Sequence, residues 1–322
     1  MAMLPSGGRP IVTPTPPFNP RAPFTRAEAM AAGLTAWQLR GKDWARIFRN
    51  VYVSREVPRT VAVRARAAMR LAPAGTVVSH QTAALLWGGT VPDTSVIHVK
   101  IGYRKTFDVD GVRAHRSCRP HTGTRRHGVA VTTPEQTIMD LATDLDLVQL
   151  VVLGDRLVKR KVTTAAKLVD AADSWDGYHA ALARRAAGLV RPGVDSPPES
   201  RLRLLIVLAG LPEPTVNHII RNPETGDWAR RFELAYEDLL LAIEYEGRHH
   251  RGDDDVWADD IDRREDLDRR SWRVVQVISD GLFEHPLRTL QRIEQARLDR
   301  GAPATGAFLD DWRRYFPGRD VA

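Results

Sequence analysis

The chain has 322 residues, of which 47 are Lys or Arg and 40 are Asp or Glu, giving a formal net charge of +7. Its single cysteine, Cys118, excludes an intramolecular disulfide framework and a zinc site built from cysteines. No run of about eighteen apolar residues occurs and the N-terminus lacks an apolar signal core, so we expect neither a membrane span nor export, and a cytoplasmic location.

The charges are divided unevenly along the chain. Residues 1–194 carry 28 basic and 14 acidic side chains, whereas residues 195–322 carry 19 basic and 26 acidic ones. A basic half suits a polyanionic partner such as DNA, and an acidic half suits divalent cations. The length suits two or three domains, each with its own core. Residues 1–23 hold seven prolines and are predicted to be a disordered arm.

Residues 24–58 show the pattern of a winged-helix DNA-binding domain. Thr25 and Thr35 can each cap a short helix, with Gly33 ending the first one. A β-like run over 44–53, broken near its middle, then supplies a hairpin. The alternative is a small helical cap with ordinary surface charges.

In a winged helix the second helix enters the major groove of DNA. Gln38 and Arg40 would then face base edges, because their side chains can pair with purines. The phosphate backbone would be contacted by three further basic residues, Lys42, Arg46 and Arg49.

A resemblance to the N-terminal winged-helix domain of AbiEi-type antitoxins, from type IV toxin-antitoxin systems, is carried by the segment TRAEAMAAGLTAWQLRGKDWARIFRNVYVS. The usual Arg-Gly-Val-Tyr of the wing has Asn50 in place of the glycine here, and Asn tolerates left-handed backbone angles better than most residues. The resemblance implies an operator DNA and a toxin as partners.

Residues 59–190 are predicted to form a small α+β middle domain. Thr133 can cap a helix with Pro134 in its first position, and Gln136 is expected to complete a capping box. The segments SHQTAALLWG and TTPEQTIMDLA resemble the domain that follows the winged helix in AbiEi-like proteins. Four histidines could be ligands or acid-base groups, but their spacing matches no metal pattern and arginines lie among them, which favours a basic, phosphate-contacting loop: His80, His115, His121 and His127.

Residues 195–300 show the order helix, three strands, helix, strand and helix, which describes a small α/β sandwich, and residues 301–322 are taken as a C-terminal tail. The central stretch ends in Glu244 and Glu246, which on a strand point to one face roughly 6 to 7 Å apart. Two carboxylates at that spacing can share a cation, and buried carboxylates are costly unless paired or bound to metal. The alternative is the exposed end of an edge strand.

This region resembles the Vsr-like branch of the PD-(D/E)XK nuclease superfamily, and more closely an uncharacterised bacterial domain of that branch that follows AbiEi-like segments in actinobacterial proteins. The family pattern is Glu on the first helix, Asp on the second core strand, Glu-x-Asp-Gly on the third, a following His, and Asp-x-x-Arg on the next helix. The matching positions here are Glu199, Glu233, Glu244, Glu246, His250, Asp260 and Arg263.

Two positions depart from that pattern, because Glu233 and Glu246 stand where the family has Asp and each is one methylene longer. Mg²⁺ demands near-octahedral geometry, so the departure bears directly on activity. Gln276 also stands where relatives often have Arg. The fold class expected for the whole chain is α/β in the α+β multidomain sense: winged helix, small α+β middle domain and restriction-endonuclease-like α/β sandwich.

The resemblance implies metal-assisted phosphodiester hydrolysis, with Mg²⁺ or Mn²⁺ held by Glu199, Glu233, Glu244 and Glu246. His250 would move a proton as general base or acid. Asp260, Arg263 and Arg248 would support the site by holding phosphate or orienting the carboxylates. The main alternative is a non-catalytic AbiEi-type antitoxin or transcriptional regulator with a degenerate nuclease fold, and a third is a partner-binding protein without a nucleic-acid role.

Overall fold

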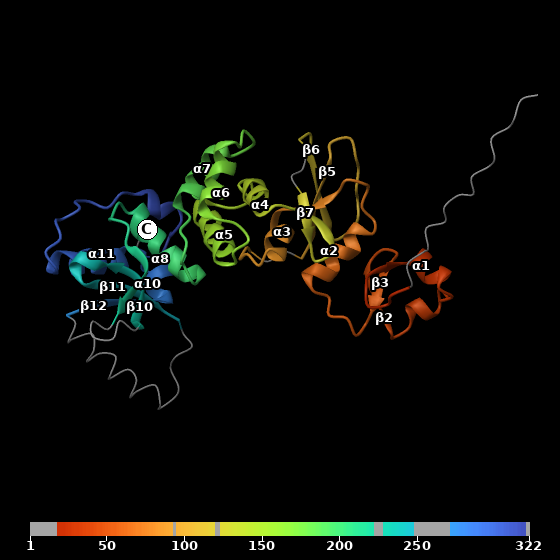
Figure 1. Cartoon of the computed structure of the whole chain (residues 1–322), viewed down its shortest axis with the longest axis horizontal. Helices are drawn as coiled ribbons and strands as arrows, with labels where there is room; N and C mark the ends of the chain where they lie inside the picture. Colours follow the sequence, from red (N-terminus) through yellow and green to blue (C-terminus); the bar gives the residue numbers. More distant parts are fainter. Residues whose placement is uncertain (1–17, 93–94, 120–122, 222–227, 248–270, 320–322) are drawn as a thin grey trace, which may run out of the picture.

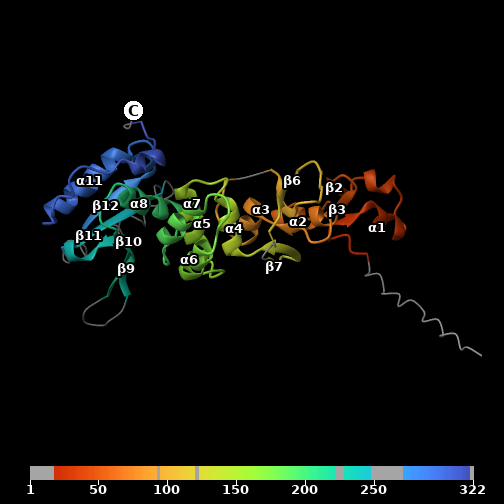
Figure 2. The same ribbon diagram turned by 90° about the horizontal axis from the view of Figure 1, so that it is seen from above.

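The computed structural model describes residues 18–92, 95–119, 123–221, 228–247 and 271–319. Over these residues the fold is mixed α and β, with ten α-helices and three sheets. The elements follow one another in a row from the N-terminal sheet to the C-terminal one (Figure 1), and the same order is seen from above (Figure 2). No helix in this part of the chain is long and apolar enough to cross a membrane.

The N-terminal unit is a three-stranded antiparallel sheet with a helix beside it. Its elements are β1 (Phe24–Thr25), α1 (Arg26–Ala31), β2 (Trp44–Phe48) and β3 (Val51–Ser54), and the strand order is β1-β3-β2. Thr25 caps α1 as expected, because Glu28 N donates to its hydroxyl at 3.2 Å and its own N–H donates to the Glu28 carboxylate at 2.7 Å. Asn50 takes the left-handed backbone angle expected in the hairpin turn, with φ of 63°.

The second helix expected in this unit is a single 3₁₀ turn, η1 (Gln38–Arg40). The predicted cap is present, since Gln38 N donates to the Thr35 hydroxyl at 3.2 Å and Thr35 N donates to Gln38 Oε1 at 2.7 Å. The helix stops early because the backbone is already extended at Gly41. The turn still buries Leu39 in the small core of the unit.

The next unit contains a five-stranded mixed sheet in the order β6-β5-β4-β8-β7. The chain runs through α2 (Val61–Met69), β4 (Val77–Val78), α3 (His80–Leu86), β5 (Ile97–Gly102), β6 (Val112–Ser117), β7 (Gly123–Arg126) and β8 (Val129–Thr132). The strand β4 has only two residues, and β7 has four.

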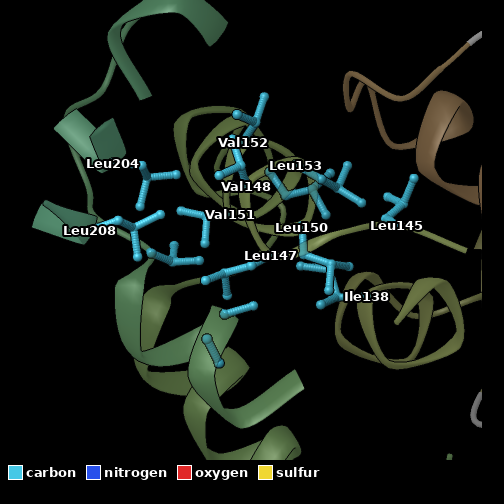
Figure 3. Close-up of a cluster of buried hydrophobic side chains, with 14 of the residues drawn as sticks. Ile138, Leu145, Leu147, Val148, Leu150, Val151, Val152, Leu153, Leu204 and Leu208 are labelled. Atoms are coloured by element: carbon cyan, nitrogen blue, oxygen red, sulfur yellow. The ribbon is translucent and has the colours of Figure 1, made fainter. Parts of the chain in front are cut away.

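Four helices follow the sheet: α4 (Pro134–Leu141), α5 (Leu147–Lys159), α6 (Ala165–Asp173) and α7 (Ala180–Leu189). Figure 3 shows the side chains of α5 between Ile138 of the preceding helix and Leu204 and Leu208 further along the chain. Of the two hydrogen bonds expected in the capping box of α4, only one has the predicted partner. Thr133 does accept from Gln136 N, but the Gln136 amide donates to Asp140 at 2.8 Å instead of returning to the cap.

The C-terminal unit is a four-stranded sheet in the order β12-β11-β10-β9. Its elements are α8 (Pro197–Leu208), β9 (Thr215–Arg221), β10 (Trp228–Tyr236), η2 (Glu237–Leu239), β11 (Leu241–Glu246), β12 (Arg273–Ile278), α10 (Ser279–Phe283) and α11 (Pro286–Asp299). β9, β10 and β11 are antiparallel neighbours, whereas β11 and β12 run parallel. The helices α8 and α11 pack on the apolar face of this sheet.

Residues 301–319, within the segment expected as a C-terminal tail, are part of the packed structure. Trp312, in η4 (Asp311–Arg314), is fully buried and Phe316 is 2% exposed. Leu309 N donates to the carbonyl of Ala209 at 3.0 Å, which fixes the segment to the end of α8. One continuous core cluster runs from Ala65 to Phe316, so the predicted boundary between the middle and C-terminal domains is not a break in the core.

Candidate active site

The first helix of the C-terminal unit carries Glu199 in its first turn. Ser196 caps α8, accepting from Glu199 N at 3.3 Å, and the Glu199 carboxylate accepts from Asp195 N at 2.9 Å. Glu199 is only 4% exposed. Burial raises the pKa of its carboxyl and the Asp195 charge adds to this, whereas hydrogen bonds to the carboxyl from the Asp195 backbone and from the Ser196 side chain oppose it.

Glu233 lies where β10 and β11 stop pairing regularly. The register of these strands extends from Tyr236 opposite Leu241 to Leu234 opposite Ile243. Beyond that point the Glu233 carboxylate accepts the Tyr245 N–H at 2.7 Å. The Glu233 side chain therefore reaches across to the backbone of the neighbouring strand.

The carboxyl of Glu233 is the most perturbed acid of the cluster. Burial raises its pKa to about 7, and the charges of Glu199 and Glu244 push it in the same direction. The Tyr245 hydrogen bond and Arg231 act in the opposite direction. Three predicted site carboxylates are thus brought close enough to interact electrostatically, although they come from three different elements.

Glu244 is held by an arginine of the neighbouring strand. Arg230 Nη2 lies 3.3 Å from Glu244 Oε2, and its guanidinium also stacks 4.9 Å from the centre of the Phe232 ring. Glu244 pairs in register with Gln276 of β12, whose side chain is exposed. Glu246, two residues along β11, is exposed at the end of the strand.

Asp195, which was not predicted as a site residue, lies just before α8 and adds its charge to the cluster. Its carboxylate forms an ion pair with Lys159 Nζ at 2.7 Å and a second one with Arg231. The cluster therefore has cationic groups around a carboxylate-rich centre. Only the paired arginines that precede Phe232 gave any signal of this in the sequence.

The residues fit a divalent cation in their chemistry. Carboxylate oxygens are the ligands that Mg²⁺ and Mn²⁺ favour, and a cation would offset the burial and the carboxylate repulsion that together raise the pKa of Glu233. Within the ranges that the structure describes, no three His, Cys, Asp or Glu side chains gather into a ready metal-binding group. The other candidates of the predicted site, His250, Asp260, Arg263 and Arg248, lie outside the described residues.

The predicted DNA-contacting residues all lie on the surface of the N-terminal unit. Gln38 and Arg40 are on η1, Arg46 is on β2, and Lys42 and Arg49 flank that strand; all five side chains are exposed. The Gln38 amide oxygen is already used in the Thr35 cap.

Two arginines that the sequence analysis did not single out lie close to Arg46. Arg55 and Arg59 line a surface hollow of about 290 Å³ together with it. Arg55 is fixed there, because its Nε donates to the Lys42 carbonyl at 2.6 Å. The N-terminal unit thus presents a concentrated positive surface.

Comparison with known proteins gives a distant relationship. No family model matches the chain. Two uncharacterised proteins of Mycobacterium tuberculosis, from the strains CDC 1551 / Oshkosh and ATCC 25618 / H37Rv, are each 26% identical to it over 225 residues. The aligned region covers 69% of this chain and 81% of each relative.

Proposed function

We propose that this chain is a DNA-binding protein whose C-terminal α/β unit hydrolyses phosphodiester bonds with the help of Mg²⁺ or Mn²⁺. The observation that carries the proposal is the half-buried Glu233 carboxylate at the point where β10 and β11 stop pairing. It accepts the Tyr245 N–H at 2.7 Å, and burial together with the charges of Glu199 and Glu244 raises its pKa to about 7. Buried carboxylates that repel one another are costly, and a functional site is where such a cost is retained.

The arrangement of the C-terminal elements supports the same proposal. A helix, three antiparallel strands and a fourth strand parallel to the third follow the order expected for a Vsr-like, restriction-endonuclease-like core. In that core the carboxylates come from the first helix and from the two central strands. Glu199, Glu233 and Glu244 occupy α8, β10 and β11.

The side chains of this unit have distinct roles in the proposed reaction. A bound cation would acidify a water molecule and stabilise charge on the phosphate. Glu199, Glu233 and Glu244 would hold it, with Glu246 at the open end of β11. Arg230 and Arg231 place positive charge beside these carboxylates, where a phosphate oxygen would bind. In the proposal His250 moves the proton, with Arg248, Asp260 and Arg263 in support.

In this proposal the N-terminal half binds the DNA. Residues 1–194 carry twice as many basic as acidic side chains, and the exposed cations of η1 and β2 form the winged-helix surface of the proposal. Backbone contacts of this kind make affinity fall steeply with salt. We expect Arg46→Ala and Arg49→Ala each to reduce the slope of log affinity against log salt by about one. Arg300→Ala, in the acidic half, is the control and leaves the slope unchanged.

Cleavage is tested with supercoiled and nicked plasmid in the presence of Mg²⁺ or Mn²⁺. We expect Glu233→Gln and Glu244→Gln to lower the cleavage rate by about 100-fold or more, because each removes a negative charge from the proposed cation site. Asp238→Asn changes an exposed carboxylate of the η2 turn and should leave the rate intact.

A second readout does not depend on turnover. Mn²⁺ should raise the melting temperature of the unmodified protein and of Asp238→Asn, and should not do so for Glu233→Gln. Absence of both cleavage and metal-dependent stabilisation would contradict the proposal.

A second candidate function is a non-catalytic regulator of the AbiEi antitoxin type, with a toxin as its partner. It is favoured by the ion pair of Glu244 with Arg230, which satisfies one of the central carboxylates without a metal. One experiment distinguishes the two candidate functions. Operator binding that survives Glu244→Ala, in a protein that cuts no plasmid, would support the regulator.

A further inference from the structure

A second cluster of reactive side chains lies in the middle of the chain, far from the carboxylates along the row of elements in Figure 1. The strand β5 alternates apolar with polar residues, and both polar residues, His98 and Lys100, are buried. β5 and β6 are parallel with Lys100 opposite His115, so these side chains share one face of the sheet. Burying such a polar face is costly unless its groups find partners.

A cavity of about 640 Å³ opens on this face. That volume lies within the range of roughly 300–1,000 Å³ in which proteins bind small molecules. The lining combines buried groups of the sheet and of α4 with exposed arginine and aromatic side chains from the surrounding loops. It is therefore polar at buried positions and mixed aromatic and cationic at exposed ones.

Asp140 of α4 is a cavity-lining residue with an unused hydrogen-bonding atom. Its Oδ1 accepts from Lys100 Nζ and from the Gln136 amide, the latter at 2.8 Å. Its Oδ2 is buried and has no hydrogen-bond partner in the part of the chain that the structure describes. The side chain is 3% exposed. A ligand with an N–H or O–H donor would satisfy this oxygen.

The two histidines that line the cavity, His80 and His115, are stacked on each other. The rings of His80 and His115 stack with centroids 3.5 Å apart and planes 13° apart, and His115 Nε2 lies 3.0 Å from His98 Nδ1. Burial lowers the pKa of His80 to about 2 and that of His115 to about 4, so both rings are neutral at physiological pH. His80 also has a φ of 50°, a backbone strain that proteins tend to retain at functional sites.

The exposed lining residues suit a planar ring that carries an anion. Tyr103 is 64% exposed and Tyr178 is 84% exposed, so both are available for stacking. Arg119 lies 5.2 Å from the centre of the Trp175 ring and is ion-paired with Asp176. Arg116 is exposed and forms no ion pair within the described residues, which leaves it as the cation for a phosphate group.

We propose that this cavity binds a nucleotide. Its base stacks on the aromatic side chains, an amine or ring N–H of the base donates to Asp140, and its phosphate pairs with Arg116. The same chemistry fits a free nucleotide and an unpaired nucleotide of a nucleic acid. The site shares no residue with the carboxylate cluster, so it stands whether or not that cluster cuts DNA.

Isothermal titration of the full-length protein with AMP, GMP, CMP and UMP tests the proposal, with inorganic phosphate and ribose 5-phosphate as probes that lack a base. We expect at least one nucleotide to bind more tightly than either probe. Tyr178→Ala should weaken that binding about tenfold through lost stacking, and Arg116→Ala should weaken it by about as much through the lost phosphate contact. Arg104→Ala, an exposed arginine next to Tyr103 that does not line the cavity, is the matched control.

Asp140→Asn removes the acceptor but leaves the buried Lys100 without its charge partner, so the two exposed variants decide the test if it does not fold. Binding of phosphate as tight as that of every nucleotide would overturn base recognition. No nucleotide binding, or binding that ignores both Tyr178→Ala and Arg116→Ala, would overturn the site.

Titration with a short single-stranded oligonucleotide then distinguishes a free nucleotide from an unpaired nucleotide of a nucleic acid as the ligand. Tighter binding than the free nucleotide assigns the site to nucleic acid, and weaker binding assigns it to a free nucleotide; both support the site. Glu233→Gln should bind the nucleotide unchanged, which distinguishes a failure of this inference from a failure of the proposed nuclease.

Discussion

At the scale of single residues, burial acts on two sets of ionisable groups with opposite results. It raises the pKa values of the Glu199 and Glu233 carboxyls and lowers those of the His80 and His115 imidazoles. In both sets the charged form is disfavoured, because the protein interior solvates ions poorly. The carboxylates are left needing a cation or a proton, whereas the histidines remain neutral.

The two buried histidines make the free energy of unfolding depend on pH. In the unfolded chain an imidazole takes up a proton as the pH falls through about 6.5, whereas His115 in the folded protein does so near pH 4 and His80 near pH 2. Above about pH 6.5 both imidazoles are neutral in the folded and unfolded chains, so their titration does not reduce the free energy of unfolding. As the pH falls below this value the unfolded chain binds protons first, and the free energy of unfolding decreases. Between about pH 6.5 and pH 4, each imidazole should lower the free energy of unfolding by up to about 1.4 kcal/mol per pH unit.

We expect His80→Asn to flatten this acid dependence, since it removes one titrating group and Asn tolerates the left-handed backbone at this position. Urea unfolding at a series of pH values between 4 and 7 measures it. His179→Asn is the matched control, because His179 is exposed and has a similar φ of 56°. An unchanged slope for His80→Asn would show that His80 does not titrate on unfolding.

At the scale of elements, close packing of α5 against the residue that follows α7 depends on one glycine. A Cβ on Gly154 would lie 2.4 Å from Val190 Cγ2, in a fully buried part of the helix. Ala is normally better than Gly in a helix by roughly 0.5–1 kcal/mol. Overpacking here costs about 1–3 kcal/mol and outweighs that gain.

Gly154→Ala should therefore lower the free energy of unfolding, by about 1 kcal/mol or more. Gly188→Ala in α7 should raise it by about 0.5–1 kcal/mol, because a Cβ there meets nothing within 4 Å. The double variant Gly154→Ala with Val190→Ala relieves the contact and should lose less than the sum of its single changes. Chemical denaturation of the variants measures all of these, and a stabilised Gly154→Ala would refute the packing argument.

Local signals in the sequence predicted many of the helices and strands, but they did not predict the tertiary contacts. The Thr25 cap predicted α1, and the apolar run ending at Glu244 and Glu246 predicted β11. The length of η1 and the partner of Gln136 depend on neighbours that a local pattern does not contain. For the candidate site, the strand spacing supplied Glu244, and the resemblance supplied Glu199 and Glu233.

Two features of the candidate site could not be read from spacing. Asp195 donates its N–H to Glu199, and its carboxylate pairs with Lys159 of α5, a residue from a different predicted domain. Arg230 reaches Glu244 only because β10 and β11 are neighbours in the sheet. Both contacts are set by how distant parts of the chain pack.

At the scale of the whole molecule, the two predicted domains beyond the N-terminal unit share one core. Asp155 of α5 joins them through buried polar groups, accepting from Ser200 Oγ at 2.7 Å and from Arg203 Nη2 at 3.2 Å. Arg203 is fully buried and also donates to the Leu189 carbonyl at 2.8 Å. A charged group buried in this way strongly resists separation from its partner. The proposed nucleotide cavity and the carboxylate cluster are therefore carried by elements that share one core.

Trp312 tests this unity, because it lies close to the C-terminus and is fully buried in the same core as α5. Trp312→Ala should cost about 3–5 kcal/mol of the free energy of unfolding, through lost apolar contacts and the cavity left behind. Trp37→Ala is the control and should change it by less than about 0.5 kcal/mol, since Trp37 is 77% exposed.

If the core is one cooperative unit, the amide protons in α5 exchange through global opening of the protein. Trp312→Ala must then accelerate their exchange by the factor that corresponds to its loss of free energy of unfolding. Hydrogen exchange measured by mass spectrometry over residues 147–159 provides the readout. Faster exchange confined to residues near Trp312, with α5 protected as before, would mean that the C-terminal unit opens on its own and that the shared core does not couple the two sites.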